Sequence, residues 1–172
     1  LEVFTQLVKN RKNYPGMLLG IGTVMDAATT QKFIVAGADF IISPIMKPEM
    51  ARVCNQNNTP WIPGCATLTE IVNARDIGAS VIKVFPGSVL GPAFVSSILP
   101  VVPDLKLMIT GGVELNEENL RAWFRAGALC VGLGSHLFTK EIMTNKAWNK
   151  LEMKVAQALS IIGKIKADVN PN

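Results

Sequence analysis

A lysine inside an apolar run is the residue of this sequence best suited to covalent chemistry. Lys83 lies in VIKVFP (81–86), a segment with the length and composition of a buried strand. Lysine is almost never fully buried without a reason. Burial lowers the pKa of the ammonium group and yields the free amine that can attack a ketone and form a Schiff base. The structural alternative is a side chain that reaches solvent or pairs with a carboxylate on a neighbouring strand.

The alternation of a strand places Lys83 and Phe85 on one face and Val84 on the other. If the strand belongs to a barrel of parallel strands, Lys83 and Phe85 share its interior near the carboxyl-terminal rim, where such barrels carry out catalysis. Lys106 offers a comparison, because it lies near the start of the next strand, in LKLMITGG (105–112). We interpret Lys106 as structural.

Two later strands end in glycine-rich segments, ITGG (109–112) and GLGS (132–135). Glycines let backbone N–H groups approach an anion closely, and a hydroxyl adds one more donor. Barrels of this type often bind a substrate phosphate after their last two strands. Together and in this order, the two segments favour a phosphate site over plain turns.

The remaining polar residues give weaker signals. His136 is the only histidine and directly follows Ser135, so the two side chains diverge and predict no Ser–His nucleophile pair. A lone histidine of this kind is more often structural or at the surface. With one histidine and no clustered carboxylates, the sequence predicts no metal site. Three aspartates lie on helix-to-strand connections, at the wrong end of the strands for catalysis: Asp39, Asp76 and Asp104.

Elements that must position these residues follow a regular strand-and-helix repeat. Helical patterns open at Asp26, at Thr67 with Glu70 as a capping box, and at Asn116. The expected strands are the runs 18–23, 40–44, 61–64, 81–86, 105–112 and 130–135. The expected helices are 1–12, 26–37, 67–78, 116–127 and 145–167, the last with an apolar stripe of Trp148, Leu151, Val155, Leu159 and Ile162.

This alternation predicts an α/β fold with a parallel sheet, and the similar strand ends favour a closed (β/α)8 TIM barrel over an open sheet. Only six strands are visible, and the chain opens inside a helix. We therefore expect one barrel domain over residues 1–172 whose first strand, first helix and second strand are absent from the sequence.

Composition excludes several classes of protein. Of 172 residues, 49% are hydrophobic and 17% charged, which is typical of a globular chain. Mean hydropathy is +0.31, yet no run approaches the ~20 apolar residues of a membrane helix. The net charge of +4 is scattered and aromatic residues are few, which argues against nucleic-acid binding. Three unclustered cysteines argue against a disulfide framework, and no signal peptide is visible, so we expect a cytoplasmic enzyme.

Several motifs, in order and spacing, resemble the 2-keto-3-deoxy-6-phosphogluconate (KDPG) aldolase family, which includes 4-hydroxy-2-oxoglutarate aldolases. The resemblance runs from about Leu1 to the final helix, and IKVFP followed by TGG is its most specific part. The motifs are GIGTV (20–24), ISP (42–44), IPG (62–64), IKVFP (82–86), TGG (110–112) and GLGS (132–135).

The resemblance implies a class I aldolase, usually a homotrimer without metal or cofactor, that cleaves the phosphorylated keto acid to pyruvate and glyceraldehyde 3-phosphate. It makes Lys83 the Schiff-base lysine. It implies that Thr23, Pro44 and Phe85 line the pyruvate end of the pocket, with Thr110 near the substrate chain. It also implies that the phosphate is held by Gly111, Gly112, Gly134 and Ser135.

The sequence departs from the family pattern at its start. In the family, the general acid/base is a glutamate on strand two, close to an arginine that binds the substrate carboxylate. Neither residue has a counterpart here, because the sequence starts after that strand. General acid–base help is worth ~10²–10⁴-fold in rate, so these 172 residues alone are expected to be a poor enzyme. We expect the native chain to be longer.

Two other functions fit parts of the sequence. One is a phosphate-binding βα-barrel isomerase or synthase without an imine, which needs ITGG and GLGS but no buried lysine. The other is a non-catalytic relative or interaction module built on a partial barrel.

Overall fold

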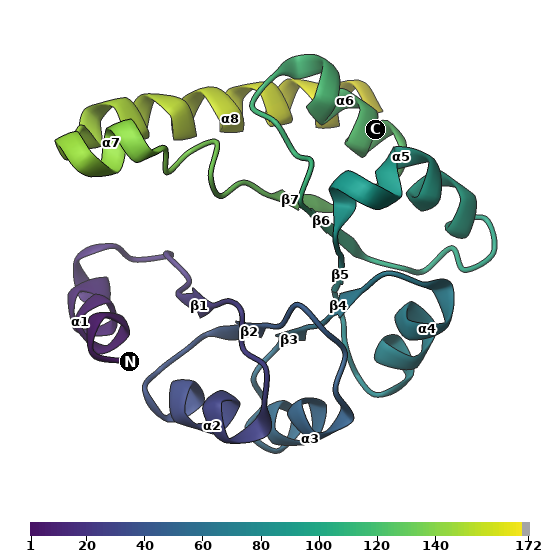
Figure 1. The fold of residues 1–172 in the computed structure, drawn as a ribbon, viewed down its shortest axis with the longest axis horizontal. Helices are drawn as coiled ribbons and strands as arrows, with labels where there is room; N and C mark the ends of the chain where they lie inside the picture. Colours follow the sequence, from purple (N-terminus) through teal and green to yellow (C-terminus); the bar gives the residue numbers. More distant parts are fainter. Residues whose placement is uncertain (170–172) are drawn as a thin grey trace. The chain divides into compact units, whose positions relative to one another are not determined.

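A computed structural model describes residues 1–169 of the chain, which divide into two compact units, 1–83 and 84–169 (Figure 1). Both units alternate short strands with helices. The first unit contains α1 (Glu2–Asn10), β1 (Gly20–Ile21), α2 (Ala27–Val35), β2 (Phe40–Ile42), α3 (Pro48–Gln56), β3 (Trp61–Ile62), β4 (Gly64–Cys65), α4 (Leu68–Asp76) and most of β5 (Ile82–Val84). A short 3-10 helix, Arg11–Asn13, follows α1.

Parallel pairing organises the strands of the first unit. β1 pairs with β2 and β2 with β3, with Gly20 opposite Phe40 and Ile41 opposite Trp61. The helices α2 and α3 lie on one side of this sheet (Figure 1). Phe4 of α1 packs edge-on against Phe33 of α2, with 5.3 Å between ring centroids. The fully buried core side chains of this unit include Ile41, Met50 and Ile71.

Local capping explains where α4 begins. The Thr67 hydroxyl accepts a hydrogen bond from the Glu70 amide at 3.2 Å, and the Glu70 carboxylate accepts one from the Thr67 amide at 3.0 Å. The predicted capping box is therefore confirmed. The predicted caps Asp26 and Asn116 also accept a backbone amide, at the starts of α2 and of α6 (Glu117–Arg125).

The second unit continues the same alternation. It contains α5 (Gly87–Ile98), which kinks at Gly91, then β6 (Leu107–Thr110), α6, β7 (Cys130–Gly132), α7 (Lys140–Asn145) and α8 (Trp148–Val169). β6 and β7 run parallel, with Ile109 opposite Val131. The side chains of Leu107, Ile109 and Leu120 are fully buried. Parallel strands joined through helices confirm the predicted α/β class.

Several predicted boundaries change. The expected strand 61–64 is two strands, β3 and β4, separated by Pro63, which has no amide hydrogen to donate to a ladder. The first helix ends at Asn10 and the last begins at Trp148. The predicted helices do not include α3, α5 or α7, although Thr139 caps α7 through its hydroxyl.

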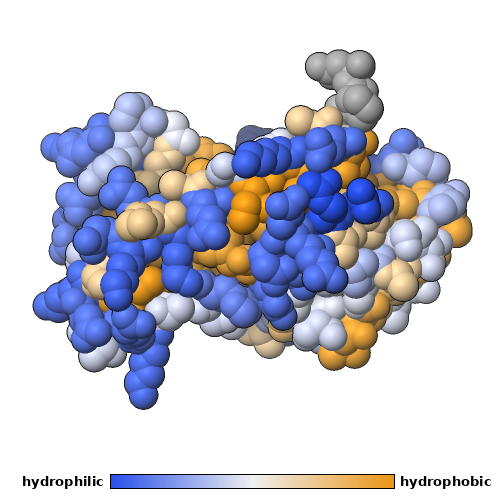
Figure 2. All heavy atoms as spheres, turned by 90° about the horizontal axis from the view of Figure 1, so that it is seen from above, coloured by the Kyte–Doolittle hydropathy of each residue, from blue (hydrophilic) through white to orange (hydrophobic). Residues whose placement is uncertain are grey.

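The apolar stripe predicted for the last helix is only partly covered within residues 1–169, where Leu151 and Ile162 are half-buried. Trp148 is 52% exposed and Leu159 is 66% exposed. The residues of α8 that are buried are Ala158 and Ile165, because α8 packs against α6 through a neighbouring face. Figure 2, which looks onto the side that carries α8, shows a mostly hydrophilic surface broken by apolar patches.

Candidate functional site

Lys83 occupies the middle of β5, whose three residues are all buried. Its backbone amide donates a 2.8 Å hydrogen bond to the carbonyl of Pro63, which fixes the strand next to the β3–β4 segment. The residue is only 8% exposed. Burial removes water from the ammonium group and lowers the pKa of Lys83 below its ordinary 10.5. The predicted buried strand is confirmed, and the environment favours a neutral amine.

Pro44 follows β2, and its position is set by two close contacts. The carbonyl carbon of Pro44 would lie 2.4 Å from a Cβ atom on Gly64, so position 64 accepts only glycine without a backbone shift. The preceding Ser43 is fully buried and donates a 2.6 Å hydrogen bond to the carbonyl of Ile45. The Trp61 indole N–H donates to the Ser43 hydroxyl at 3.0 Å. This network fixes the loop that carries Pro44.

Thr23 lies between β1 and α2 and is exposed. Its φ of 60° places it in the left-handed region, which is unusual for a β-branched residue. Such conformations persist when the surrounding structure imposes them, and they concentrate at functional sites. The first unit therefore carries three of the predicted site residues, Thr23, Pro44 and Lys83, each at or just after a strand.

The second unit gathers the predicted phosphate residues around one cavity of about 250 Å³. The cavity lies at the carboxyl ends of β6 and β7, because its residues end or follow those strands. Phe85, two residues after Lys83 in the chain, also lines it. The full lining is Phe85, Thr110, Gly111, Gly112, Val113, Gly132, Gly134, Ser135 and His136.

Backbone geometry explains the glycine pair in this cavity. Gly111 and Gly112 have φ values of 89° and 70°. A Cβ atom on Gly112 would lie 2.7 Å from the Ser88 Cα atom, at the start of α5. Position 112 thus requires glycine both for its conformation and for the close approach of the two segments. The backbone around this turn stays open to the cavity.

Thr110 contributes a buried hydroxyl group that lacks a hydrogen-bond partner within residues 1–169. A buried hydroxyl normally finds a partner, because leaving it unpaired costs about 1–3 kcal/mol. Thr110 also belongs to the lining of the cavity.

The sequence predicts His136 to be structural or at the surface, and the residue is exposed. It also lines this cavity. It follows Ser135 in a turn closed by the amides of Leu137 and Phe138, which both donate to the carbonyl of Gly134 at 3.0 and 2.9 Å. The position of His136 directly after GLGS is the signal in the sequence that could have placed it at this cavity.

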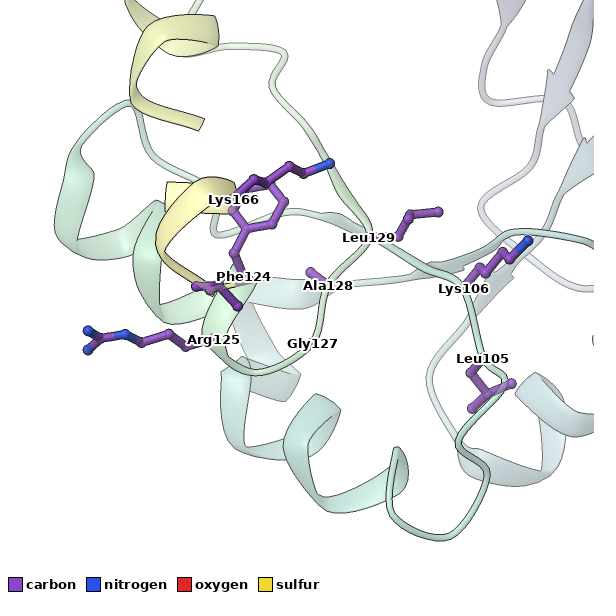
Figure 3. Close-up of a pocket in the computed structure, with 9 residues that line it drawn as sticks. Leu105, Lys106, Phe124, Arg125, Gly127, Ala128, Leu129 and Lys166 are labelled. Carbon is purple, nitrogen blue, oxygen red and sulfur yellow. The ribbon is translucent and has the colours of Figure 1, made fainter. Parts of the chain in front are cut away.

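A second cavity, of about 290 Å³, lies at the amino ends of β6 and β7 (Figure 3). Lys106, Arg125 and Lys166 line it, but they do not converge, because Arg125 extends away from the other two. Lys166 instead lies over the Phe124 ring, 5.4 Å from its centroid. Lys106 is exposed there, which agrees with its interpretation as structural.

Asp39, predicted to lie on a helix-to-strand connection, directly precedes β2. Asp39 accepts hydrogen bonds from the Leu19 amide and from Arg11, and both lower the pKa of its carboxyl group. Within the described residues, no group of three or more His, Cys, Asp or Glu side chains is arranged to hold a metal. None of the helices in residues 1–169 could cross a membrane.

Burial also governs the cysteines, which are free thiols. It raises the pKa of Cys54 to about 11 and the pKa of Cys65 to about 12. Both side chains are buried and remain protonated at neutral pH. They are core residues rather than nucleophiles.

Comparison with known proteins places this arrangement among aldolases. The chain is 32% identical over 146 residues to a 2-dehydro-3-deoxy-6-phosphogalactonate aldolase of Escherichia coli, covering 84% of this chain and 67% of the relative. It is 31% identical over 154 residues to a 2-dehydro-3-deoxy-phosphogluconate aldolase of Treponema pallidum, covering 89% and 72%. Across the first three such relatives, the chain spans 58% to 72% of their length.

A solved structure is similar over the same region. The KDPG aldolase of Legionella pneumophila, with pyruvate captured as a covalent carbinolamine intermediate, superposes with a TM-score of 0.80 at 25% identity, covering 93% of this chain and 74% of that one. The family model described as "Aldolase: KDPG and KHG aldolase" matches residues 2–154. That match extends over most of the sequence, from α1 into α8, and the chain therefore belongs to the KDPG and KHG aldolase family.

Proposed function

We propose that the protein is a class I aldolase that cleaves 2-keto-3-deoxy-6-phosphogluconate to pyruvate and glyceraldehyde 3-phosphate. The observation that carries this proposal is a buried strand lysine, Lys83, whose pKa is lowered by desolvation. Membership of the aldolase family supports it, and so does the covalent pyruvate intermediate named for the Legionella relative. The family name adds 4-hydroxy-2-oxoglutarate as a second candidate substrate.

The neutral amine of Lys83 attacks the C2 ketone, and loss of water leaves a protonated imine. A base removes the proton of the C4 hydroxyl, the C3–C4 bond breaks, and its electron pair passes to the imine nitrogen. The products of this step are glyceraldehyde 3-phosphate and an enamine on Lys83. The enamine takes a proton at C3, and water hydrolyses the resulting imine to pyruvate and the free amine.

The other predicted site residues receive roles by the same proposal. Thr23, Pro44 and Phe85 contact the pyruvyl part of the substrate. Thr110 contacts the substrate chain, and its buried unpaired hydroxyl supports this role. The phosphate is bound by the backbone of Gly111, Gly112 and Gly134 and by Ser135, which line one cavity of the second unit.

At the level of the whole protein, we propose a single (β/α)8 barrel domain that assembles as a homotrimer, acts in the cytoplasm and uses neither metal nor cofactor. The parallel pairing of β1 with β2, β2 with β3 and β6 with β7 supports the barrel. The similarity to solved KDPG aldolases supports it as well. The trimer rests on the family resemblance.

Substitution of Lys83 by alanine tests the reaction. In the whole protein, Lys83→Ala should abolish the release of pyruvate from 2-keto-3-deoxy-6-phosphogluconate while the fold, followed by circular dichroism, persists. Lys106→Ala is the matched control, because Lys106 is an exposed lysine at the amino end of β6 and should retain turnover. Turnover that survives Lys83→Ala would instead favour a phosphate-binding isomerase or synthase without an imine.

A further inference from the structure

The lining of the cavity at the carboxyl ends of β6 and β7 includes one imidazole side chain in addition to its glycine motifs. His136 is the only histidine of the chain, and it lines this cavity. None of the residues that line the cavity, all within 85–136, carries a carboxylate. A cavity walled by backbone amides, hydroxyls and one imidazole is suited to an anion.

A lysine from another element is bound to the same loop. The Lys154 ammonium group, on α8, donates a 3.2 Å hydrogen bond to the backbone carbonyl of His136. The loop itself is a closed turn, since the amides of Leu137 and Phe138 both bond to Gly134. Lys154 thus connects this turn to α8 and places one positive charge beside the backbone of His136.

The charges around Lys154 leave this positive charge in place. Glu141, at the start of α7, forms its ion pair with Lys150 at 2.7 Å. The hydrogen bond from Lys150 is the main reason that the pKa of Glu141 is lowered, and the charge of Lys154 adds only a smaller effect. Because Lys150 already neutralises Glu141, Lys154 adds net positive charge next to the loop.

We propose that His136 binds the distal phosphate of the substrate and that Lys154 acts as its positioning residue, so that the pair sets a preference for phosphorylated over unphosphorylated keto acids. The inference rests on the proposed function and adds two residues to its phosphate site. An imidazole N–H adds a side-chain donor to the backbone amides, and a hydrogen bond to an ionised acceptor such as a phosphate is about twice as strong as one between neutral groups.

The test compares two substrates in the whole protein, 2-keto-3-deoxy-6-phosphogluconate and its unphosphorylated analogue 2-keto-3-deoxygluconate. His136→Asn and Lys154→Met should each lower the ratio of the two kcat/KM values on the order of tenfold, mainly through a higher KM for the phosphorylated substrate. Lys154→Arg should restore much of the ratio. Lys164→Met is the control and should leave the ratio unchanged, because Lys164 is an exposed lysine of α8 that does not line the cavity.

The outcomes separate the two proposals. If the unaltered protein cleaves neither substrate, the proposed aldolase activity is wrong and this assignment is wrong with it. If the unaltered protein is active and the ratio stays constant in both variants, the assignment alone is overturned. Equal losses for both substrates would also overturn it, because they would show damage to the fold rather than lost recognition of the phosphate.

Discussion

Lys83 has an ionisable amine in a position where only 8% of the residue is exposed to solvent. An ionised amine and a buried position oppose each other energetically. Burial makes the charged form costly, and the pKa of Lys83 falls below its usual value. A nucleophilic amine needs this shift, because only the neutral form attacks a carbonyl. The energetic cost of burying the lysine is therefore part of the proposed chemistry.

This cost predicts how stability varies with pH. Between the lowered pKa of Lys83 in the folded chain and the ordinary 10.5, the unfolded chain binds more protons, so the free energy of unfolding rises with pH. Relative to Lys83→Met, the unaltered protein should gain stability as pH rises from neutral towards 10.5. Urea unfolding of both proteins across this range measures the difference. A difference that stays flat or falls would contradict a lowered pKa.

At the scale of elements, the turn after β6 shows how local geometry shapes the proposed phosphate site. Gly111 and Gly112 turn the chain with positive φ values directly against the start of α5. The turn leaves no space for a side chain at 112. Gly134, on the loop after β7, has open space around it. Gly112 is therefore constrained by its surroundings and Gly134 is not, although both line the cavity.

Alanine substitutions distinguish these two positions. Gly112→Ala combines an unfavourable φ with a clash against Ser88, and should destabilise the protein by about 1–3 kcal/mol or more. Gly134→Ala should cost less than about 1 kcal/mol, because its Cβ atom meets nothing within 4 Å. Denaturant midpoints of the two variants give the comparison. Similar losses at both positions would show that the turn is not the constrained element.

Sequence reasoning succeeded where a structure depends on neighbours along the chain. The capping box of Thr67 and Glu70 was predicted because its hydrogen bonds join residues three apart. The buried strand around Lys83 was predicted from its apolar neighbours. Failures came from long-range packing: the face of α8 that is buried depends on where α6 lies, and sequence periodicity did not separate it from the adjacent stripe.

The candidate site also contains features that the sequence predicts and features that depend on distant segments. Gly111, Gly112, Gly134 and Ser135 were expected to act together, and the structure brings them to one cavity. The unpaired hydroxyl of Thr110 and the bond from Lys154 to His136 could not be predicted, because each depends on side chains from distant segments. The hydrogen bond between Trp61 and Ser43, which helps to fix the loop of Pro44, also joins distant segments, β3 and the loop after β2.

For the whole molecule, the central claim is that Lys83 forms an imine with a keto acid, and borohydride trapping tests it most directly. The whole protein is incubated with pyruvate, reduced with borohydride, digested and mapped by peptide mass. Our account predicts a reduced pyruvyl adduct on the peptide that contains Lys83, and none in the Lys83→Ala variant. A folded, whole protein that forms no adduct, or forms it on another lysine such as Lys106, would contradict the account.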